Sequence, residues 1–332
     1  MISVVLVNWN GWKDTIACLQ SLLNSDTVPA RFIVVDNASS NDSIERIRQW
    51  ANKKIEVEKT GDECEKYALQ GKYCSRHIVD VNYNDIINNT AASSMEFSLH
   101  QMQLIIYLVC SPRNGGFGYG CNVGMSLAKQ LGTDVIWLLN NDCVVKSESL
   151  KIIYNHVLKN KNTIFGTVLK YYYKPNRTQA IGGGHLSRLT GSVSTFDRPS
   201  FRSTLNFING ASMAVCKEIF EAIGGFDENI FMYFEENDFC IRAEKAGYKF
   251  DVIDTDVFHK HGGSLGCKST VRSWEQVYIN KHYVLKKNFG WGVWVFFFFF
   301  VLVIRSLLPV GQQTTRQGAR RALAHFIFGK VI

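Results

Sequence analysis

Short apolar runs alternate with amphipathic segments in the first half of the chain. Each apolar run is nearly continuous, which is typical of parallel strands buried on both faces. The runs are Ile2–Val7, Arg31–Val35, Gln103–Cys110 and Asp134–Leu139. Segments with helical spacing follow and end near Leu23, Trp50 and Leu131. This β-α alternation predicts an open α/β sheet.

Polar side chains follow the ends of these strands, at the edge where open α/β sheets bind ligands. Asn8 and Asn10 follow the first strand, Asp36 ends the second and Asn140–Asp142 follows the fourth. Asp36 could accept hydrogen bonds from a base or ribose, and capping a helix is an equal alternative. Asp142 could give one hard oxygen ligand to Mg²⁺ or Mn²⁺, with diphosphate oxygens as further ligands, or could cap a helix.

Two segments give less information. Ser111–Gly124 carries five glycines, which permit positive φ and close backbone approach to a ligand. Its pattern, GGFGYG after the third strand, does not match the dinucleotide fingerprint. Residues 51–101 are polar, hold a potential Cys64–Cys74 pair and interrupt the alternation, so we interpret them as an insertion between the second and third core strands.

The stretch Phe226–Gly247 places three carboxylates, Glu235, Glu236 and Asp238, behind an aromatic run. Helical spacing from Asp238 onward and a glycine at its end predict a helix whose N-terminus carries the acids. One interpretation is a well-capped, solvated helix start. The other is a catalytic carboxylate beside an aromatic wall.

Composition restricts the class of protein. An apolar fraction of 46% and 5 prolines in 332 residues argue against disorder. The nine cysteines lack metal-binding spacing and several lie in apolar runs, so we expect reduced core cysteines of a cytoplasmic protein. The chain starts directly with a strand-like run, and we expect no signal peptide.

The C-terminal part is basic and aromatic. From Gln276 onward there are eight basic residues and no acid, so the rest of the chain is formally neutral, given a net charge of +8. The apolar run 291–304 is shorter than the ~20 residues of a spanning helix. Its flanking cations favour an interfacial or re-entrant membrane contact, and a buried helix or a dimer contact is the alternative. Nucleic acid is not an expected partner, because the basic residues are sparse.

Seven motifs make the sequence recognisable. They are, in order, VVLVNWNG, VVDNASSND, NGGFGYGCNVG, WLLNND, NGASMAV, GGFDENIFMYFEENDFCIRAEKAGY and VFHKHGGS. Together they resemble the family-2 glycosyltransferases of GT-A fold, closest to the bacterial rhamnosyltransferase-like branch that builds surface polysaccharides. The resemblance covers about residues 1–50 and 103–290 and leaves the insertion outside.

The resemblance implies an α/β fold of GT-A type. Such a fold has a Rossmann-like, mixed but mostly parallel nucleotide-binding sheet flanked by helices, here with a helical, hydrophobic C-terminal extension. We expect a nucleotide-sugar-binding half at 1–150, with the insertion 51–101, and an acceptor-binding and catalytic half at 151–270. A basic, aromatic helical region is expected at 271–332.

The resemblance also implies a divalent metal, Mg²⁺ or Mn²⁺, at a DxD-type motif. Here the motif reads Asn140-Asn141-Asp142, so Asp142 is the expected metal ligand. A metal would stabilise the negative charge of the leaving diphosphate. His259 is the expected second ligand, favoured over His261 by its spacing to the following GGS, and Lys260 is expected to contact the diphosphate.

The donor contacts follow from the same resemblance. Asp36 is expected to read the pyrimidine base, and Asn209–Met213 to form a strand beneath the donor sugar, with a plain strand bulged at Gly210 as the alternative. The other expected substrate contacts are Asn8, Asn10, Asn114, Gly116, Phe117, Asn122, Asn141, Gly210, Met213 and Arg242.

Inverting transfer needs one carboxylate to take the proton of the acceptor hydroxyl. Family members commonly carry Glu-Asp at this point; this chain has Glu235-Glu236, and Glu236 aligns with the base. Asp238 is the rival base, otherwise expected to orient the acceptor or cap the helix, and Arg242 could pair with it at helical spacing. A helix N-terminus would lower the pKa of the base, whereas an aromatic pocket would raise it.

The expected function is inverting, metal-dependent sugar transfer from a nucleotide-diphosphate donor to a polyprenyl-diphosphate-linked glycan. dTDP-rhamnose is the favoured donor and a UDP-sugar the alternative. We expect a cytoplasmic enzyme held on the inner face of the membrane through residues 289–332. The alternative is a catalytically silent nucleotide-sugar-binding scaffold, and a processive membrane synthase is disfavoured by the lack of a QxxRW-type motif.

Overall fold

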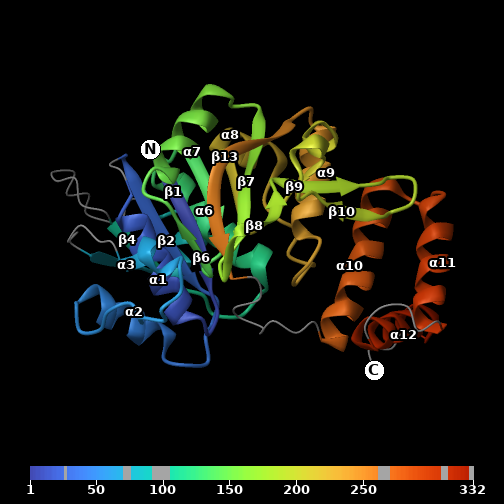
Figure 1. The fold of residues 1–332 in the computed structure, drawn as a ribbon, viewed down its shortest axis with the longest axis horizontal. Coiled ribbons are helices and arrows are strands. Elements are labelled where there is room, and N and C mark those ends of the chain that lie inside the picture. The colour runs from blue at the N-terminus through green and yellow to red at the C-terminus, as the bar shows by residue number, and fades with distance from the viewer. Residues whose placement is uncertain (26–27, 70–75, 92–104, 261–269, 308–312, 329–332) are drawn as a thin grey trace.

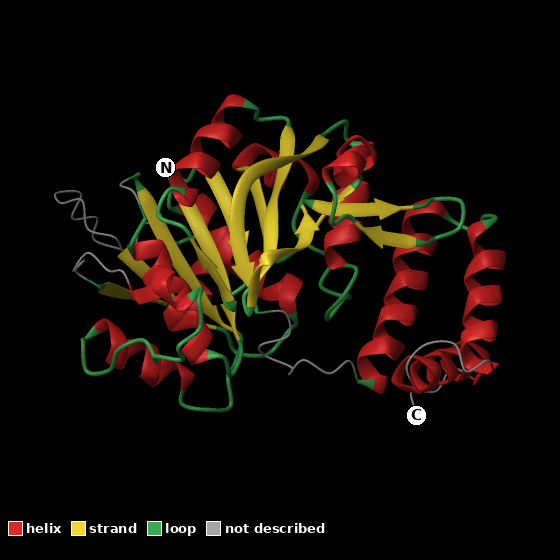
Figure 2. Cartoon of the chain, in the orientation of Figure 1, coloured by secondary structure: helices red, strands yellow, loops and turns green. Residues whose placement is uncertain are grey.

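The computed structural model describes the chain except for residues 26–27, 70–75, 92–104, 261–269, 308–312 and 329–332. A large twisted sheet with helices on both faces forms the body, and three helices form a separate unit at one end (Figures 1 and 2). The strand order of the sheet is β3-β4-β2-β1-β5-β12-β7-β13-β6, with β8 paired to β7.

One half of the sheet is parallel. Its strands are β1 (Ile2–Asn8), β2 (Ala30–Asp36), β3 (His77–Val81), β4 (Ile105–Cys110) and β5 (Val135–Leu139). Val4 and Leu6 of β1 pack into the core on one face, whereas Val5 packs into the core on the other. Burial on both faces explains why β1, β2, β4 and β5 read as continuous apolar runs, and these four predicted strands are confirmed, with Gln103 and Leu104 outside the described residues. Strand β3 is only partly buried and was not predicted.

The other half is mixed. It contains β6 (Cys143–Val145), β7 (Thr163–Tyr171), β8 (Lys174–Ile181), β12 (Ser212–Cys216) and β13 (Lys249–His259). Strand β12 is antiparallel to both β5 and β7, while β13 runs parallel to β7. A single sheet therefore runs through residues 1–150 and 151–270, and its mixed, mostly parallel character agrees with the expected fold class.

Helices cover both faces of this sheet. On one face lie α1 (Trp12–Leu23), α2 (Ser43–Ala51) and α7 (Ser149–Lys159), and on the other α6 (Phe117–Gln130), α8 (Lys217–Ile223) and α9 (Glu235–Lys245). A small antiparallel sheet of β9 (Gly183–Leu186), β10 (Val193–Thr195) and β11 (Phe207–Ile208), with the 3₁₀ helix η1 (Pro199–Thr204), lies beside α9.

The insertion adds to the sheet. Within it, β3 pairs in parallel with β4 and so forms the edge of the sheet. The short helices α3 (Glu65–Leu69) and α4 (Tyr83–Ile87) pack on α1 and α6. Cys64 is buried with a free thiol, and Cys74 lies outside the described residues. All seven cysteines within the described ranges are free, and only Cys110 among them is exposed.

The C-terminal unit consists of α10 (Val271–Phe289), α11 (Trp294–Leu307) and α12 (Gln313–Phe328). Helix α12 packs on both α10 and α11, and α10 packs on α9. The expected helical, hydrophobic extension is therefore present. Within the described ranges, no helix combines the length and apolarity needed to cross a membrane.

Two local expectations need correction. Asn209–Ala211 is a turn and the strand begins only at Ser212, so Gly210 is a turn residue instead of a strand bulge. The helix expected from Asp238 begins earlier, at Glu235, so all three acids lie in its first turn. Its predicted glycine end is confirmed: Gly247 has φ +88°, and the amide of Tyr248 donates to the Ala243 carbonyl.

Candidate active site

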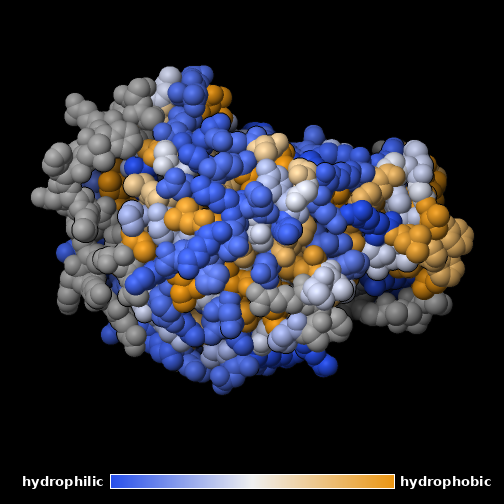
Figure 3. All heavy atoms as spheres, turned by 90° about the horizontal axis from the view of Figure 1, so that it is seen from above, coloured by the Kyte–Doolittle hydropathy of each residue, from blue (hydrophilic) through white to orange (hydrophobic). Residues whose placement is uncertain are grey.

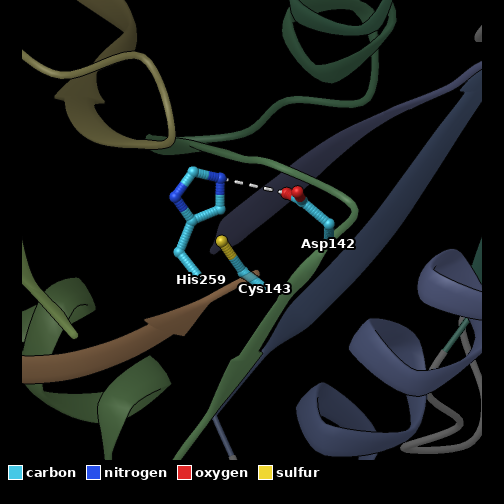
Figure 4. Close-up of side chains that lie close together, drawn as sticks. All are labelled: Asp142, Cys143 and His259. Carbon is cyan, nitrogen blue, oxygen red and sulfur yellow. Dashed lines mark ion pairs between the residues drawn. The ribbon is translucent and has the colours of Figure 1, made fainter. Parts of the chain in front are cut away.

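Asp142 and His259 face one another at the sheet edge (Figure 4). His259 ends β13 and Asp142 immediately precedes β6, which pairs with β13 through Cys143 and His259. Asp142 Oδ1 lies 3.2 Å from His259 Nε2, and both side chains are largely buried. The backbone pairing of two strands thus brings the two expected metal ligands together.

A glutamine orients the histidine. His259 Nδ1 lies 3.0 Å from Gln179 Oε1 on β8. Because an amide oxygen only accepts, Nδ1 donates in this contact, and Nε2 is the ring nitrogen that faces Asp142. A metal-binding histidine needs this arrangement, in which the second ring nitrogen donates to a fixed acceptor.

A metal would fit between these two groups. The ligand atoms of Asp142, Cys143 and His259 all lie within 4.8 Å of one another. Burial raises the pKa of the Cys143 thiol well above its usual range, so the sulfur stays protonated and is a poor ligand for a hard cation. The carboxylate and the imidazole therefore form a two-residue set that suits Mn²⁺ or Mg²⁺ with additional oxygen ligands from a bound diphosphate.

The polar residues at the ends of β1, β2 and β5 form one hydrogen-bonded cluster. Asn8 donates from Nδ2 to Asp36 Oδ1 at 2.6 Å, and its Oδ1 accepts from the Thr15 hydroxyl. Asn141 donates to Thr15 Oγ1, 2.9 Å away. Asp36 also accepts from the backbone amide and hydroxyl of Ser39. These bonds fix the floor of the expected nucleotide pocket.

Asn10 shapes the loop beside this cluster. It has φ +57°, a conformation that asparagine tolerates better than most residues. Its side-chain oxygen accepts from the backbone amides of Ser40 and Asn41, and its backbone amide donates to the Ser39 hydroxyl. Asn10 therefore positions the loop after β2, where Asp36 lies.

The glycine-rich segment packs directly against the loop that precedes α9. Gly116 has φ +90°, and a Cβ there would collide with the carbonyl of Phe231. The Phe117 amide donates to that same carbonyl at 3.1 Å. Asn114 accepts from the Gly116 amide and from Asn37 Nδ2. Glycine at 116 is thus required by a close backbone approach within the protein.

Asn122 braces the same loop from α6. It donates to the Phe226 carbonyl at 3.0 Å and accepts from the Phe226 amide at 2.8 Å. It also donates to Glu228. These two hydrogen bonds to the backbone of Phe226 give Asn122 a structural role in the protein, where a substrate contact was expected.

Lys260 lies next to the metal ligand in sequence and is paired. Its Nζ donates to Asp14 Oδ1 at 2.6 Å and lies 4.8 Å from the Tyr172 ring centre. Although burial alone would lower the pKa of Lys260, the charge of Asp14 raises it above its usual value. Its backbone amide donates to the Asp142 carbonyl, whereas its ammonium is ion-paired with Asp14 on α1.

The turn at 209–211 lies between the NND segment and the acidic helix α9. The Asn140 amide donates to the Ala211 carbonyl at 2.9 Å. A Cβ placed on Gly210 would lie 3.4 Å from the Phe117 ring and 3.9 Å from Glu236 Cβ. The structure therefore gathers the NND segment, Gly210, Phe117 and Glu236 on one side of the sheet.

Glu235 and Glu236 differ in their surroundings. Glu235 is 5% exposed, and its Oε2 has no hydrogen-bond partner among the described residues, whereas Glu236 is half-buried. Burial, followed by the neighbouring charge of Glu236, raises the pKa of Glu235 well above its usual value. Burial also raises the pKa of Glu236. Glu235 is therefore the more deeply buried and harder to ionise of the two, and Glu236 is the more accessible carboxyl group.

The two residues before this pair have unusual backbone angles. Tyr233 and Phe234 have φ +71° and +74°, in the left-handed region that bulky side chains rarely adopt. A residue in this conformation costs about 1–3 kcal/mol of folding free energy, so the conformation persists only where the surrounding structure enforces it. Local strain of this kind immediately before two buried acids is typical of a functional site.

Asp238 and Arg242 are engaged within the protein. Asp238 is fully buried, and its Oδ2 accepts from Arg242 Nε at 2.8 Å, which confirms the expected i,i+4 pair. Arg242 also donates to the carbonyls of Ile223 and Gly225. We therefore assign neither residue a substrate contact. Met213 is also fully buried in the hydrophobic core, away from any surface that could bind a donor sugar.

Three supporting residues were not identified from the sequence. Gln179 orients His259, Thr15 joins the strand-end cluster and Asn37 donates to Asn114 and to the Gly116 carbonyl. Asn37 follows Asp36 directly, so its position at a strand end was a usable signal. No local pattern marks Gln179, which lies on a hairpin strand of otherwise ordinary polar composition.

Comparisons with known proteins agree with this geometry. A family model described as "Glycosyltransferase like family 2" matches residues 68–265, more than half of the chain. This match confirms the resemblance seen in the sequence motifs.

Two curated relatives are distant in sequence. The chain is 24% identical over 247 residues to the low-salt glycan biosynthesis hexosyltransferase Agl10 of Haloferax volcanii. The aligned region covers 74% of this chain and 62% of that protein. It is 22% identical over 220 residues to the dTDP-rhamnosyl transferase RfbF of Shigella flexneri. This second aligned region covers 62% of this chain and 71% of the relative. The chain thus spans less than two thirds of the length of Agl10.

A solved structure supports the fold. GalNAc-T7, crystallised with UDP, GalNAc and Mn²⁺, is similar with a TM-score of 0.57 over 97% of this chain and 54% of the other, at 14% identity. At this identity the similarity concerns the fold alone, and it confirms the expected GT-A class.

The surroundings of Glu235 predict a pH-dependent gain in stability for Glu235→Gln. The folded protein holds a proton that the unfolded chain releases above about pH 4.3, so unfolding free energy of the wild type falls as pH rises through the folded-state pKa. Glutamine is neutral throughout. The advantage of the variant in urea unfolding should be smallest near pH 4 and grow by about 1–2 kcal/mol towards pH 8. The exposed Glu148→Gln should show no such trend, and a constant difference for Glu235→Gln would contradict the assignment.

Proposed function

The chain belongs to glycosyltransferase family 2 and is a glycosyltransferase, and we propose that it transfers a sugar from a nucleotide-diphosphate donor with inversion, using Glu236 as the base. The observation that carries this proposal is the position of Glu236. It is the accessible member of a buried carboxylate pair, and its Cβ lies 3.9 Å from the Cβ position built on Gly210, in the turn joined to the NND segment. A single displacement needs one such base.

Glu235 supports the base without replacing it. A protonated Glu235 would add no repulsion to a charged Glu236, and the half-buried carboxylate of Glu236 would then accept the proton of the acceptor hydroxyl. Burial raises the pKa of Glu236 and so increases its strength as a base relative to a solvated glutamate. Asp238 takes no part in the proton transfer, because its carboxylate is fully buried and ion-paired.

Asp142 and His259 would hold a divalent metal, Mg²⁺ or Mn²⁺. When bound, the ion would supply positive charge for the leaving diphosphate. Gln179 would hold the imidazole in the ligand tautomer, while the ammonium of Lys260, the next residue in the chain, is held by Asp14. The manganese in the GalNAc-T7 structure agrees with the choice of a hard ion.

For the donor we propose dTDP-rhamnose, with a UDP-sugar as the alternative. RfbF is described as a dTDP-rhamnosyl transferase and Agl10 as a hexosyltransferase of glycan biosynthesis. Asp36 would receive the base of the nucleotide at the end of β2, where Asn8 and Ser39 already fix its carboxylate. We propose a polyprenyl-diphosphate-linked glycan as the acceptor in surface polysaccharide synthesis.

A membrane contact is part of this proposal. Apolar side chains project from α11 and from the end of α12, and the corresponding end of the molecule is largely hydrophobic (Figure 3). The most exposed are Trp291, Val293, Phe296, Phe300, Leu307, Ile327 and Phe328, which are 54–70% exposed. The unit carries no acid from Gln276 onward, so its charge complements anionic headgroups. We propose that this apolar face lies in the interface of the cytoplasmic membrane, on its inner side.

Substitution of the base tests the transfer reaction. Glu236→Gln removes the proton acceptor but keeps the size of the side chain, so kcat should fall about 10²-fold or more, with little change in donor binding. Transfer from a panel of dTDP- and UDP-sugars provides the measurement, with the exposed Glu148→Gln as the control. If the wild type used none of these donors, or if Glu236→Gln kept full activity, the enzymatic proposal would fail in favour of a silent binding protein.

Metal dependence can be tested through Gln179. Gln179→Leu removes the acceptor that orients His259, so the Mn²⁺ concentration for half-maximal activity should rise about 10–100-fold. Saturating Mn²⁺ should restore kcat, whereas Asp142→Asn should lose Mn²⁺ binding measured by calorimetry in the presence of nucleotide. Gln317→Leu, on the exposed side of α12, should bind Mn²⁺ as the wild type does. Full activity after treatment with a chelator would refute the metal proposal.

Vesicle flotation tests the membrane contact. The triple variant Phe296→Ser, Phe300→Ser and Leu307→Ser alters exposed positions only, so it should fold normally but lose at least about tenfold in binding to phosphatidylglycerol vesicles, since each buried apolar side chain contributes roughly 1.5–3 kcal/mol. The control is Ile87→Ser with Tyr173→Ser, two exposed apolar residues on the body. Equal binding of the triple variant and the wild type would refute the contact.

A further inference from the structure

Helix α10 contacts the acidic helix α9 at two levels. The first is the backbone immediately before Glu235, and the second is the buried side chain of Asp238. Both contacts come from polar side chains on one face of α10. None of these contacts belongs to the donor or metal site described above, and their arrangement assigns a role to the first helix of the C-terminal unit.

The upper contact is made by one amide group. Asn280 Nδ2 donates to the Met232 carbonyl at 2.7 Å and to the Tyr233 carbonyl at 3.2 Å. These are the peptide groups that flank the first of two consecutive left-handed residues, Tyr233 and Phe234. A strained backbone persists only when its surroundings enforce it. Asn280 supplies such enforcement directly before the two glutamates.

The second contact is an ion pair between Lys287 and the buried carboxylate of Asp238. Lys287 Nζ lies 2.9 Å from Asp238 Oδ1 and 2.7 Å from Asp227 Oδ2, and Asn288 donates to Asp238 Oδ1 at 2.8 Å. With Arg242 on Oδ2, the carboxylate of Asp238 has a cation on each oxygen. Asp238 is 0% exposed, so loss of one cation would leave a buried charge undercompensated.

The spacing places both contacts on one line. Asn280 and Lys287 are seven residues apart, which is two helical turns on the same face. Asp238 lies one turn after Glu235 on α9, on the side that faces α10. Helix α10 therefore fixes the strained entry to α9 and its first turn at the same time, and Glu236 lies between these two fixed points.

We propose that Asn280 and Lys287 are positioning residues for the base, and that α10 holds Glu236 in the orientation that proton transfer requires. This inference rests on the proposed role of Glu236. Neither residue touches substrate. Their loss should therefore lower kcat and leave the KM for the donor unchanged, because the nucleotide site is built from β1, β2 and β5.

Two variants and two controls test the proposal in the full-length chain. Asn280→Leu keeps the size but removes both donors, and Lys287→Met keeps the stem but removes the charge. Lys287→Arg keeps a cation and serves as the rescue variant. Arg272→Met removes a positive charge from an exposed position of the same helix and is the matched control. Each protein is assayed for transfer from its best nucleotide sugar and for hydrogen exchange of the peptide 232–240.

The expected result is a fall in kcat of about tenfold for Asn280→Leu and for Lys287→Met, a KM for the donor within about twofold of the wild type, and faster exchange of peptide 232–240. Lys287→Arg and Arg272→Met should resemble the wild type in both measurements. The proposal is overturned if kcat stays within about twofold in both variants, or if kcat falls without faster exchange of that peptide. Should the wild type transfer no sugar, the proposed function fails, and the exchange measurement alone decides whether α10 positions this segment.

Discussion

The antiparallel pairing of β12 with β5 is the interaction on which the candidate site depends. Its register sets Ser212 opposite Leu139, and the next bond joins the Asn140 amide to the Ala211 carbonyl. This one pairing fixes the NND segment against the turn that contains Gly210. Because Glu236 approaches that turn, the sheet positions the candidate metal ligand Asp142 relative to the proposed base Glu236 through backbone hydrogen bonds, which side-chain substitutions cannot easily alter.

The parts of the site that could be predicted from the sequence are those encoded within single strands and their ends. Continuous apolar runs marked β1, β2, β4 and β5, because each is buried on both faces, and polar residues at their ends marked Asp36 and Asp142. The edge strand β3 was not predicted, because the sequence of the polar insertion shows no clear alternation of apolar and polar residues. Gln179 was equally invisible, since its meeting with His259 depends on the pairing of β7 with both β8 and β13.

Asp238 shows most clearly where local sequence fails. The sequence favoured Glu236 as the base and left Asp238 as its rival, or as a residue that orients the acceptor or caps the helix. Besides Arg242, whose pairing the helical spacing predicted, its partners are Lys287 and Asn288, which come about 50 positions later on a helix whose packing no local pattern reveals. Removal of one partner from a buried ion pair typically costs about 3–5 kcal/mol. A buried acid with three donors therefore has a structural role, while its less buried neighbour Glu236 stays available for chemistry.

The helix N-terminus lowers the pKa of the acidic pair and burial raises it, so the larger of the two effects sets the direction of the shift. A helix N-terminus stabilises a carboxylate by about 0.3–1 kcal/mol, and up to about 2 kcal/mol in favourable partly buried sites. Burial can shift a carboxyl pKa upward by several units, at about 1.4 kcal/mol for each. Glu235 has one oxygen without a partner among the described residues, and its N-cap residue Phe234 offers no side-chain hydrogen bond. Burial therefore outweighs the dipole at Glu235, whose pKa lies well above its usual value, and Glu236 is the less buried carboxylate of the pair.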